Sequence, residues 1–332
     1  MTKIDIFSGF LGAGKTTLIK KLVEEAYNGE KIVIIENEFG EIGIDSGFLK
    51  DSGIQVNEMN SGCICCSLVG DFGIALKKVL EEYSPDRILI EPSGVGKLSD
   101  VIRAVKELGM INACLNGYAT VVDANKCKMY MKNFGEFFND QIESAGCIVL
   151  SHTGKASHDK IHTCVELIKE HNQNAVIVTT PWDELDGKQI LEAIERSNSL
   201  NADIQELEHE HRHHDEECKC GHHHHHHDEE CECGHHYHHH AEEVFTSWGV
   251  ETINHYTVKE IENYLEQLEN DDKFGMILRA KGIVAGEDGS WIHFDYVPGE
   301  PHVRNGSADV TGRICVIGSK ITEEEIAKLF RI

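Results

Sequence analysis

Positive charge and long apolar runs are both scarce in this sequence of 332 residues. Lysine and arginine number 31 against 57 aspartates and glutamates, which gives a formal net charge of −26. A surface this acidic repels phosphate backbones and anionic lipids, so we expect neither nucleic acid nor a membrane as the main partner. The sequence contains no run of 18 apolar residues, and it therefore predicts no transmembrane helix.

The sequence also predicts no secretory signal. The first residues, MTKIDIFSGFLGAGK, lead directly from an apolar strand pattern into a glycine-rich loop, without the layout of a signal peptide. We therefore expect a cytoplasmic protein whose 12 cysteines are mostly reduced.

Short apolar segments alternate with amphipathic helical patterns over the first 200 residues. Strands are predicted at 3–7, 31–37, 86–94, 118–124, 147–151 and 175–180, and helices at 16–27, 68–83 and 99–108. This alternation predicts an α/β fold in which helices flank a mainly parallel sheet.

A different pattern begins after residue 243. Strands are predicted at 251–258, 276–285, 290–297 and 313–319, which indicates a smaller α+β domain. Two helices there should begin at capping boxes, Thr257 with Glu260 and Thr322 with Glu325. We therefore expect an N-terminal domain at 1–200 and a C-terminal domain at 244–332, joined by a linker at 201–243.

The strongest motif is GFLGAGKT, residues 9–16, which matches GxxxxGK[ST] between a strand and a helix. Backbone N–H groups of such a loop bind phosphate oxygens, and the helix N-terminus adds a favourable dipole. Lys15 should reach the β and γ phosphates, and the Thr16 hydroxyl should bind Mg²⁺. The predicted nucleotide-binding residues are Gly12, Ala13, Gly14, Lys15, Thr16 and Thr17.

A second element of a nucleoside triphosphatase follows at the end of the strand RILIE. Its last residue, Glu91, is an acid placed to hold the Mg²⁺ shell. Together with Thr16 it forms the predicted magnesium site. Lys15 and Glu91 are the predicted catalytic residues.

Three thiols lie close together in GCICC, at Cys63, Cys65 and Cys66. They could form a redox centre, part of an iron–sulfur ligand set or most of a zinc-type site, and buried inert cysteines are the plainer alternative. An iron–sulfur cluster usually requires a fourth thiolate, which the neighbouring sequence does not offer. If the strand at 54–59 runs parallel to the first strand, its end lies at the sheet edge that carries the phosphate loop, and the thiols follow from there.

The linker is rich in metal-binding side chains. Residues 206–243 hold 15 of the 22 histidines and 12 acidic residues, and include the similar blocks CKCGHHHHHH and CECGHHYHHH. Such a segment cannot build an apolar core, so we expect it to be disordered. A purification tag would normally lie at a terminus and would not carry two Cys-x-Cys-Gly units. The predicted auxiliary metal ligands are Cys218, Cys220, Cys231, Cys233, His222, His224, His226, His235 and His236.

The chain resembles the CobW-like P-loop GTPases, metallochaperone relatives of UreG and HypB. The resemblance depends on the motifs GFLGAGKTT, ENEFGE, GCICC and EPSG in that order, followed by RAKG and GRICVIG. The resemblance covers nearly the whole chain outside the linker. It implies GTP and Mg²⁺ as cofactors, and a nucleotide-responsive segment at ENEFGE. It further implies a transition-metal site made by Cys63, Cys65, Cys66, Glu36 and Glu41.

One element departs from the family pattern. The family usually carries an NKxD-like motif whose aspartate recognises guanine, whereas this chain has Ser151-His152-Thr153-Gly154 after the strand at 147–150. The expectation of GTP therefore comes from the resemblance, and ATP stays open.

The combined prediction is a metallochaperone that hydrolyses nucleotide and delivers zinc to a client metalloprotein. Cobalt and nickel accept similar ligands and remain alternatives to zinc. Two other functions stay open: a metal buffer with a regulatory nucleotide site, and a P-loop switch with structural thiols. A homodimer that depends on nucleotide is a further expectation.

Overall fold

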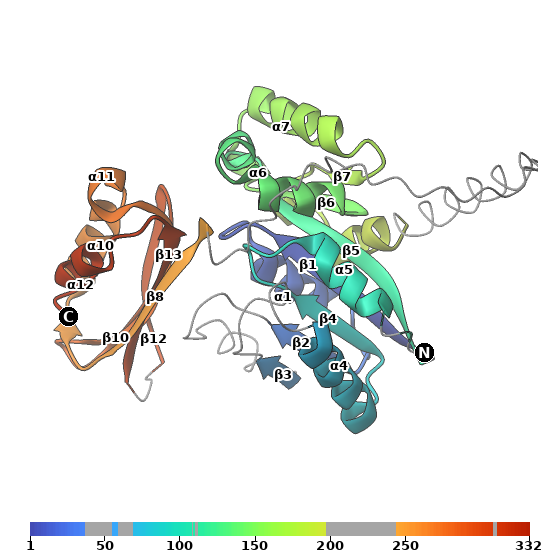
Figure 1. Ribbon diagram of the computed structural model, residues 1–332, viewed down its shortest axis with the longest axis horizontal. Coiled ribbons are helices and arrows are strands. Elements are labelled where there is room, and N and C mark those ends of the chain that lie inside the picture. Colours follow the sequence, from blue (N-terminus) through green and yellow to red (C-terminus); the bar gives the residue numbers. More distant parts are fainter. Residues whose placement is uncertain (37–54, 59–68, 108, 110–111, 197–243, 308–310) are drawn as a thin grey trace, which may run out of the picture.

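Two β-sheets organise the computed structural model (Figure 1). The structure describes residues 1–36, 55–58, 69–107, 109, 112–196, 244–307 and 311–332. The larger sheet belongs to the N-terminal half of the chain and the smaller one to the C-terminal part. Among the described residues, every helix is too short or too polar to cross a lipid bilayer.

The larger sheet has seven strands in the order β3-β2-β4-β1-β5-β6-β7, and all its pairs are parallel. The predicted parallel sheet is therefore confirmed. The strands are β1 (Thr2–Gly9), β2 (Ile32–Glu36), β3 (Gln55–Glu58), β4 (Arg87–Glu91), β5 (Ala113–Asp123), β6 (Cys147–Ser151) and β7 (Val176–Val178).

Helices cover both faces of this sheet. One face packs against α4 (Val69–Tyr83), α5 (Leu98–Glu107), α6 (Cys127–Glu143) and α7 (His158–His171). The other packs against α1 (Lys15–Glu25) and a helix at 187–196. The strand period of two explains the division, because Ile88 and Ile90 of β4 join the first cluster while Leu89 joins the second. Because both faces of these parallel strands are buried, apolar residues dominate at successive positions.

The smaller sheet is mostly antiparallel, in the order β12-β11-β10-β13-β8, with β9 paired to β10. Its strands are β8 (Thr246–Thr252), β9 (His255–Tyr256), β10 (Met276–Gly286), β11 (Trp291–Val297), β12 (Glu300–Gly306) and β13 (Gly312–Ser319). Helices α10 (Val258–Gln267), α11 (Asp271–Phe274) and α12 (Glu323–Leu329) pack on one face. This arrangement confirms the predicted α+β domain.

Two local predictions in this domain were wrong. The strand expected at 251–258 is split, because β8 pairs with β13 whereas β9 pairs with β10, and Ile253 between them is 87% exposed. The capping box of α10 is present, with Thr257 and Glu260 bonded reciprocally. Thr322 precedes α12 without a side-chain cap, since Glu325 pairs with Lys328 at 2.7 Å instead.

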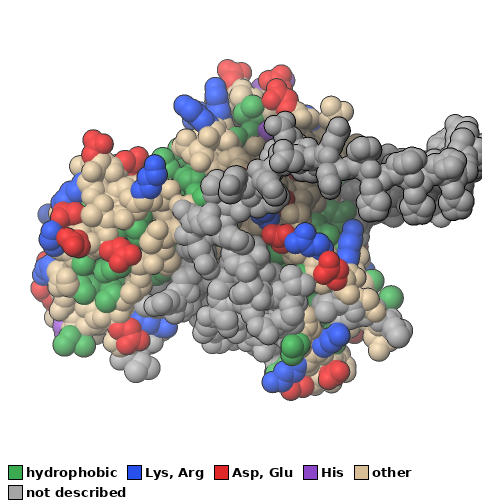
Figure 2. All heavy atoms as spheres, viewed as in Figure 1, with side chains coloured by type: hydrophobic (Ala, Val, Ile, Leu, Met, Phe, Trp, Pro, Cys, Tyr) green, Lys and Arg blue, Asp and Glu red, His purple; other side chains and the backbone are tan. Residues whose placement is uncertain are grey.

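The two domains share one apolar cluster. The face of the smaller sheet that is turned away from its helices contributes Leu278, Cys315 and Ile317 to the core of the larger domain. Phe245, just before β8, lies 5.9 Å from Phe10 of the phosphate loop, measured between ring centroids. Figure 2 shows acidic and basic side chains interspersed over the visible face of both domains.

Candidate functional site

The phosphate loop joins β1 to α1, and aromatic side chains of the core pack against it. Gly14 has φ +100°, a left-handed conformation that favours glycine, and it forms the N-cap of α1. Phe10 is fully buried, with its ring centroid 4.5 Å from that of Tyr130. The loop is therefore held in place by the core.

Lys15 lies within this loop. Its ammonium donates to the carbonyl oxygen of Gly9 at 2.9 Å and to that of Phe10 at 3.4 Å, and its residue is only 6% exposed. An ammonium held in this position suits the binding of β and γ phosphates.

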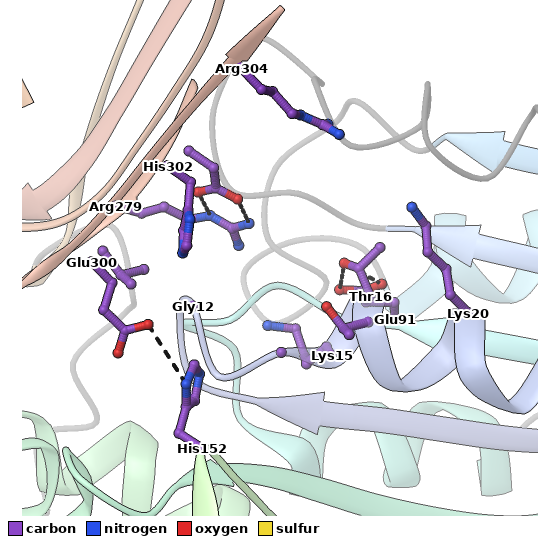
Figure 3. A pocket seen from close by; sticks show the side chains of 14 residues that line it. Gly12, Lys15, Thr16, Lys20, Glu91, His152, Arg279, Glu300, His302 and Arg304 are labelled. Carbon is purple, nitrogen blue, oxygen red and sulfur yellow. Dashed lines mark hydrogen bonds and ion pairs between the residues drawn. The ribbon is translucent and has the colours of Figure 1, made fainter. Parts of the chain in front are cut away.

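Thr16 and Glu91 meet where β4 ends beside α1. The Thr16 hydroxyl donates to Glu91 Oε1 at 3.0 Å and lies 3.3 Å from Oε2 (Figure 3). A hydroxyl and a carboxylate at this separation offer the oxygen ligands that Mg²⁺ prefers. The chemistry of the pair thus fits the ion that the motif implies.

Acids mark the carboxyl ends of three neighbouring strands. In the parallel register Glu36 of β2 lies opposite Glu91 of β4 on one side and Glu58 of β3 on the other. Glu36 is 5% exposed. The strand before the cysteines runs parallel to β1 through β2 and β4, which meets the condition that the sequence left open.

In the sequence, the predicted thiol site follows the end of β3 at this sheet edge. Cys63 follows the end of β3 by five residues, which span at most about 18 Å when extended. Three strand spacings, roughly 14 Å, separate β3 from β1 and its phosphate loop. Cys63, Cys65, Cys66 and Glu41 themselves lie outside the described residues, as do Cys218, Cys220, Cys231, Cys233, His222, His224, His226, His235 and His236.

A cavity of about 320 Å³ opens between the phosphate loop and the C-terminal domain. Its wall on the N-terminal side includes Gly14, Lys15, Thr16, Thr17 and Glu91, whereas Ala13 is buried and is not part of the lining.

The other wall is lined by basic side chains of the C-terminal domain: Arg279, His302 and Arg304 (Figure 3). Arg279 donates to Asp295 at 3.1 Å. Burial would raise the pKa of Asp295, but the charges of Arg279 and Lys281 outweigh it and lower that pKa. Together with Lys15 and Lys20, these groups suit a polyanion.

The sequence pattern alone does not predict this second wall. Glu300, His302 and Arg304 alternate along β12, so they share one face of the strand. That spacing was a usable signal, but the segment is too polar to predict a strand. Arg279 belongs to the RAKG motif, but that motif alone does not predict its position in the cavity wall.

The residues in place of the guanine motif lie beside the phosphate loop. β6 ends at Ser151, and His152 follows with φ +57°. The indole of Trp182 donates to the carbonyl oxygen of Leu150 at 2.9 Å. A β-carbon built on Gly14 would lie 3.3 Å from the Trp182 ring. This corner has one aromatic face and lacks the aspartate that would recognise guanine.

Residues 3–179, more than half of the chain, match the nucleotide-binding domain described as CobW/HypB/UreG. Residues 245–331 match the C-terminal domain of the cobalamin synthesis protein CobW.

Several named proteins are similar in sequence. The zinc chaperone YeiR of Escherichia coli is 30% identical over 190 residues, 56% of this chain and 57% of YeiR. The zinc chaperone YjiA of the same organism is 31% identical over 55% of this chain and 58% of YjiA. The matched region thus spans less than two thirds of either relative. The zinc-regulated GTPase metalloprotein activator 1 of Schizosaccharomyces pombe is 27% identical over 89% of this chain and 74% of the relative.

Among solved structures, zinc-bound YjiA GTPase from E. coli aligns with 99% of this chain and 98% of that chain, with 20% identity and a TM-score of 0.42.

Proposed function

The chain belongs to the CobW/HypB/UreG family of P-loop GTPases, and on that premise we propose that it hydrolyses GTP in order to deliver a transition metal, zinc in the first place, to a client metalloprotein. Relatives named as zinc chaperones and as a zinc-regulated GTPase metalloprotein activator support zinc over cobalt and nickel. We place this activity in the cytoplasm, where thiols stay reduced.

The nucleotide would occupy the cavity above the phosphate loop. Lys15 would contact the β and γ phosphates there, beside the backbone of Gly12, Ala13 and Gly14. Thr16 and Glu91 would hold Mg²⁺, which neutralises the charge that develops on the phosphates during transfer. Thr17 also lines the cavity.

The transferred metal would bind beside this site. We assign Cys63, Cys65, Cys66, Glu36 and Glu41 as its ligands, because thiolates with a carboxylate suit a tetrahedral zinc site. The observation that supports this assignment best is the register of Glu36 with Glu91 on adjacent parallel strands. The segments that carry the metal ligands and the Mg²⁺ ligand thus leave one edge of one sheet.

Energetics suggest how the metal leaves. A zinc site rich in thiolates binds by about 10–16 kcal/mol, whereas coupling between two sites is usually about 1–3 kcal/mol. Nucleotide hydrolysis alone would therefore loosen the ion without expelling it. Transfer would proceed by ligand exchange with a docked client, and the nucleotide state, through ENEFGE or a nucleotide-dependent homodimer, would set its timing.

We propose that residues 201–243 form a metal-collecting linker between a GTPase domain at 1–200 and a CobW-type domain at 244–332. Its cysteines and imidazoles would provide many weak, exchanging sites and so raise the local metal concentration. Deletion of 208–240 should then slow delivery when free zinc is limiting and leave it unchanged when zinc is abundant. If the deletion variant delivers zinc as fast as the wild type even when free zinc is limiting, the segment serves storage or spacing instead.

Turnover tests the main proposal. GTP and ATP hydrolysis should be compared across Zn²⁺, Co²⁺ and Ni²⁺ in the full chain and in the variant with Cys63, Cys65 and Cys66 changed to alanine. We expect the triple variant to keep nucleotide binding and lose the stimulation by metal. An unchanged metal response would refute the coupling between the two sites.

A metal buffer is the second candidate, and the net charge of −26 with 15 histidines in one segment favours it. In a buffer the nucleotide would change metal affinity without being consumed. Negligible hydrolysis with metal and client both present would establish this alternative.

A further inference from the structure

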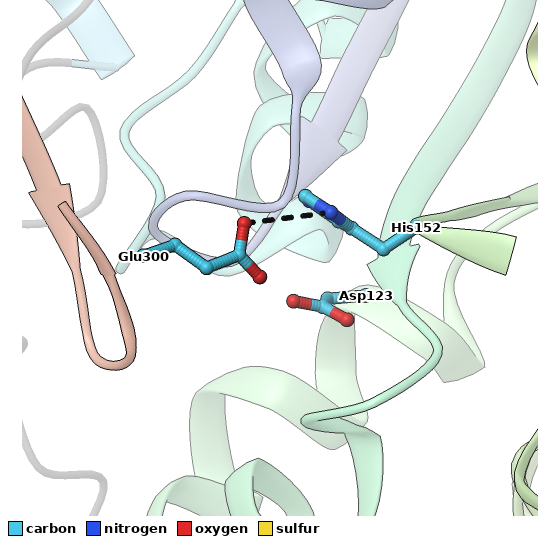
Figure 4. Close-up of side chains that lie close together, drawn as sticks. All are labelled: Asp123, His152 and Glu300. Atoms are coloured by element: carbon cyan, nitrogen blue, oxygen red, sulfur yellow. Dashed lines mark ion pairs between the residues drawn. The ribbon is translucent and has the colours of Figure 1, made fainter. Parts of the chain in front are cut away.

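Three metal-ligating side chains converge where the two domains meet. Asp123 ends β5, His152 follows β6, and Glu300 begins β12 of the C-terminal domain (Figure 4). One ligand atom from each lies within 4.8 Å of the other two. His152 Nδ1 is 3.7 Å from Glu300 Oε2. Segments separated by almost 180 residues thus bring an imidazole and two carboxylates to one point.

Of the three side chains, the Asp123 carboxylate gives the strongest indication of a bound cation. The residue is 2% exposed, and its Oδ1 accepts a hydrogen bond from the backbone N–H of Asn125 at 2.8 Å. Within the described part of the chain, Oδ2 is buried and accepts no hydrogen bond. A buried carboxylate oxygen without such a partner is costly, which points to a cation as its ligand.

One protein cation already lies nearby. The ammonium of Lys126 is 3.6 Å from Asp123 Oδ2 and 3.9 Å from Glu300 Oε1, beyond hydrogen-bond length in both cases. The negative potential of the pair also reaches Tyr130, since burial first, and then the charges of Asp123 and Glu300, raise the pKa of its hydroxyl. Among the described residues, the ammonium of Lys126 is the cation paired with both carboxylates, and one positive charge does not balance two negative ones.

We propose that Asp123, His152 and Glu300 form a second transition-metal site, which binds zinc or a similar divalent cation across the domain junction. An imidazole among the ligands favours zinc over Mg²⁺ or Ca²⁺. Three protein ligands leave a fourth position open, which suits an exchangeable ion rather than a permanently held one. The site uses no cysteine and no residue of the linker.

Binding would draw the domains together. Ligand atoms around tetrahedral zinc lie roughly 3.3 Å apart, so the three side chains would close from their present separation. Glu300 belongs to the same hairpin as Val297, which contacts Gly12 of the phosphate loop. His152 and Glu300 also line the cavity above that loop. Zinc at this junction would therefore hold the C-terminal domain over the nucleotide.

The competing explanation is a plain ion-pair cluster in which Lys126 is the only cation. Replacing that residue separates the two. In the variant Lys126→Met a plain cluster loses its only cation and gains no metal response. A metal site loses a competitor, so its affinity for zinc should rise roughly tenfold.

Modification of His152 by diethylpyrocarbonate, followed by peptide mass spectrometry, measures the site in the full chain. Buffered free zinc makes the result independent of how much metal the linker takes up. We expect zinc to slow modification of His152 at least about tenfold, while exposed His255 stays equally reactive. The zinc concentration that gives half protection should fall in Lys126→Met.

Glu300→Gln provides the decisive comparison, because it removes a ligand from the other domain without altering His152. Half protection should then require at least about tenfold more free zinc, whereas Glu287→Gln in the same domain should match the wild type. Thermal unfolding would confirm that both variants are folded. Protection that is absent in the wild type, or equal in Glu300→Gln, would overturn the proposal.

Discussion

Val297 occupies the space that a side chain at Gly12 would need: a β-carbon built on Gly12 would lie 2.1 Å from Val297 Cγ1. The C-terminal domain thus touches the phosphate loop at a position where φ is +71° and glycine is favoured twice over.

Gly12→Ala should therefore weaken nucleotide binding through both steric clash and backbone strain. We expect a loss of more than about tenfold, since the left-handed conformation alone costs roughly 1–2 kcal/mol in a residue with a β-carbon. Val297→Ala in the same chain removes the clash and should restore part of the affinity. Binding of a fluorescent GTP analogue to the four members of this cycle gives the coupling energy. Strictly additive effects would mean that the two residues do not interact in solution.

The hydrogen bond between Thr16 and Glu91 predicts a shared role in Mg²⁺ binding. Thr16→Val and Glu91→Gln should each raise the Mg²⁺ concentration needed for half-maximal hydrolysis and lower the maximal rate, by about 10²-fold for the loss of an electrostatic partner. Thr16→Ser keeps the hydroxyl and should remain close to the wild type. Glu136→Gln, which breaks a surface pair with Lys97, is the matched control for a lost carboxylate. A normal Mg²⁺ dependence in Glu91→Gln would remove that residue from the site.

The buried guanidinium of Arg87 should contribute strongly to stability. It is 1% exposed, bonds to Asp5 and Glu30, and lies 4.5 Å above the Tyr27 ring. Burial raises the pKa of Asp5 although Arg87 opposes this shift, so the pair is held against a large desolvation cost. Arg87→Met would leave Asp5 as a buried acid without its cation and should destabilise the N-terminal domain by about 3–5 kcal/mol.

Urea unfolding, followed at the N-terminal domain, measures this effect. Lys78→Met removes an exposed i,i+4 pair with Glu82 and should change stability by less than about 0.5 kcal/mol. Adding Asp5→Asn to Arg87→Met should recover part of the loss. Equal stability of Arg87→Met and Lys78→Met would contradict the assigned role.

The start of α10 should respond to acid. The backbone N–H of Thr257 donates to the Glu260 carboxylate, and this bond lowers the pKa of Glu260 below its usual range. An acid whose pKa is lowered by folding stabilises the fold above its unfolded pKa of about 4.3, and that contribution is lost as the pH falls. Hydrogen exchange of α10 amides should therefore become faster relative to Glu260→Gln as the pH falls from about 5 to about 3. A constant ratio of the two exchange rates would show that the Glu260 charge does not stabilise α10.

The parts of the fold that could be predicted are those that depend on local pattern. Gly9–Thr16 and strands such as RILIE carry their signal within a few residues, because glycine spacing and continuous apolar character directly reflect backbone geometry and burial. The direction of β3 could only be stated as a condition from the sequence, and its parallel pairing with β2 comes from the structure.

Contacts between distant segments could not be predicted in this way. Val297 meets Gly12 and Glu300 meets His152 because the smaller sheet docks on the larger domain, and no local pattern encodes that docking. β12 could not be predicted, because this polar strand at the edge of the sheet lacks the apolar alternation of a central strand. The charges of Asp5 and Arg87 stand out inside apolar strands, but only the sheet order shows that they pair.

Base preference gives the last prediction, because the chain has Gly154 where the family usually has the aspartate that recognises guanine. A β-carbon at Gly154 would meet no atom within 4 Å, so Gly154→Asp should fit without rearrangement. Its carboxylate could accept both N–H groups on the guanine edge, whereas adenine offers no such pair of donors. A bidentate contact of this kind discriminates by about 1–3 kcal/mol, so the ratio of GTP to ATP affinity should rise at least about tenfold. Competition binding measures the ratio directly, with Gly154→Asn as the uncharged control. A ratio that does not change would mean that the base lies elsewhere, with Trp182 beside Gly14 as the next residue to test.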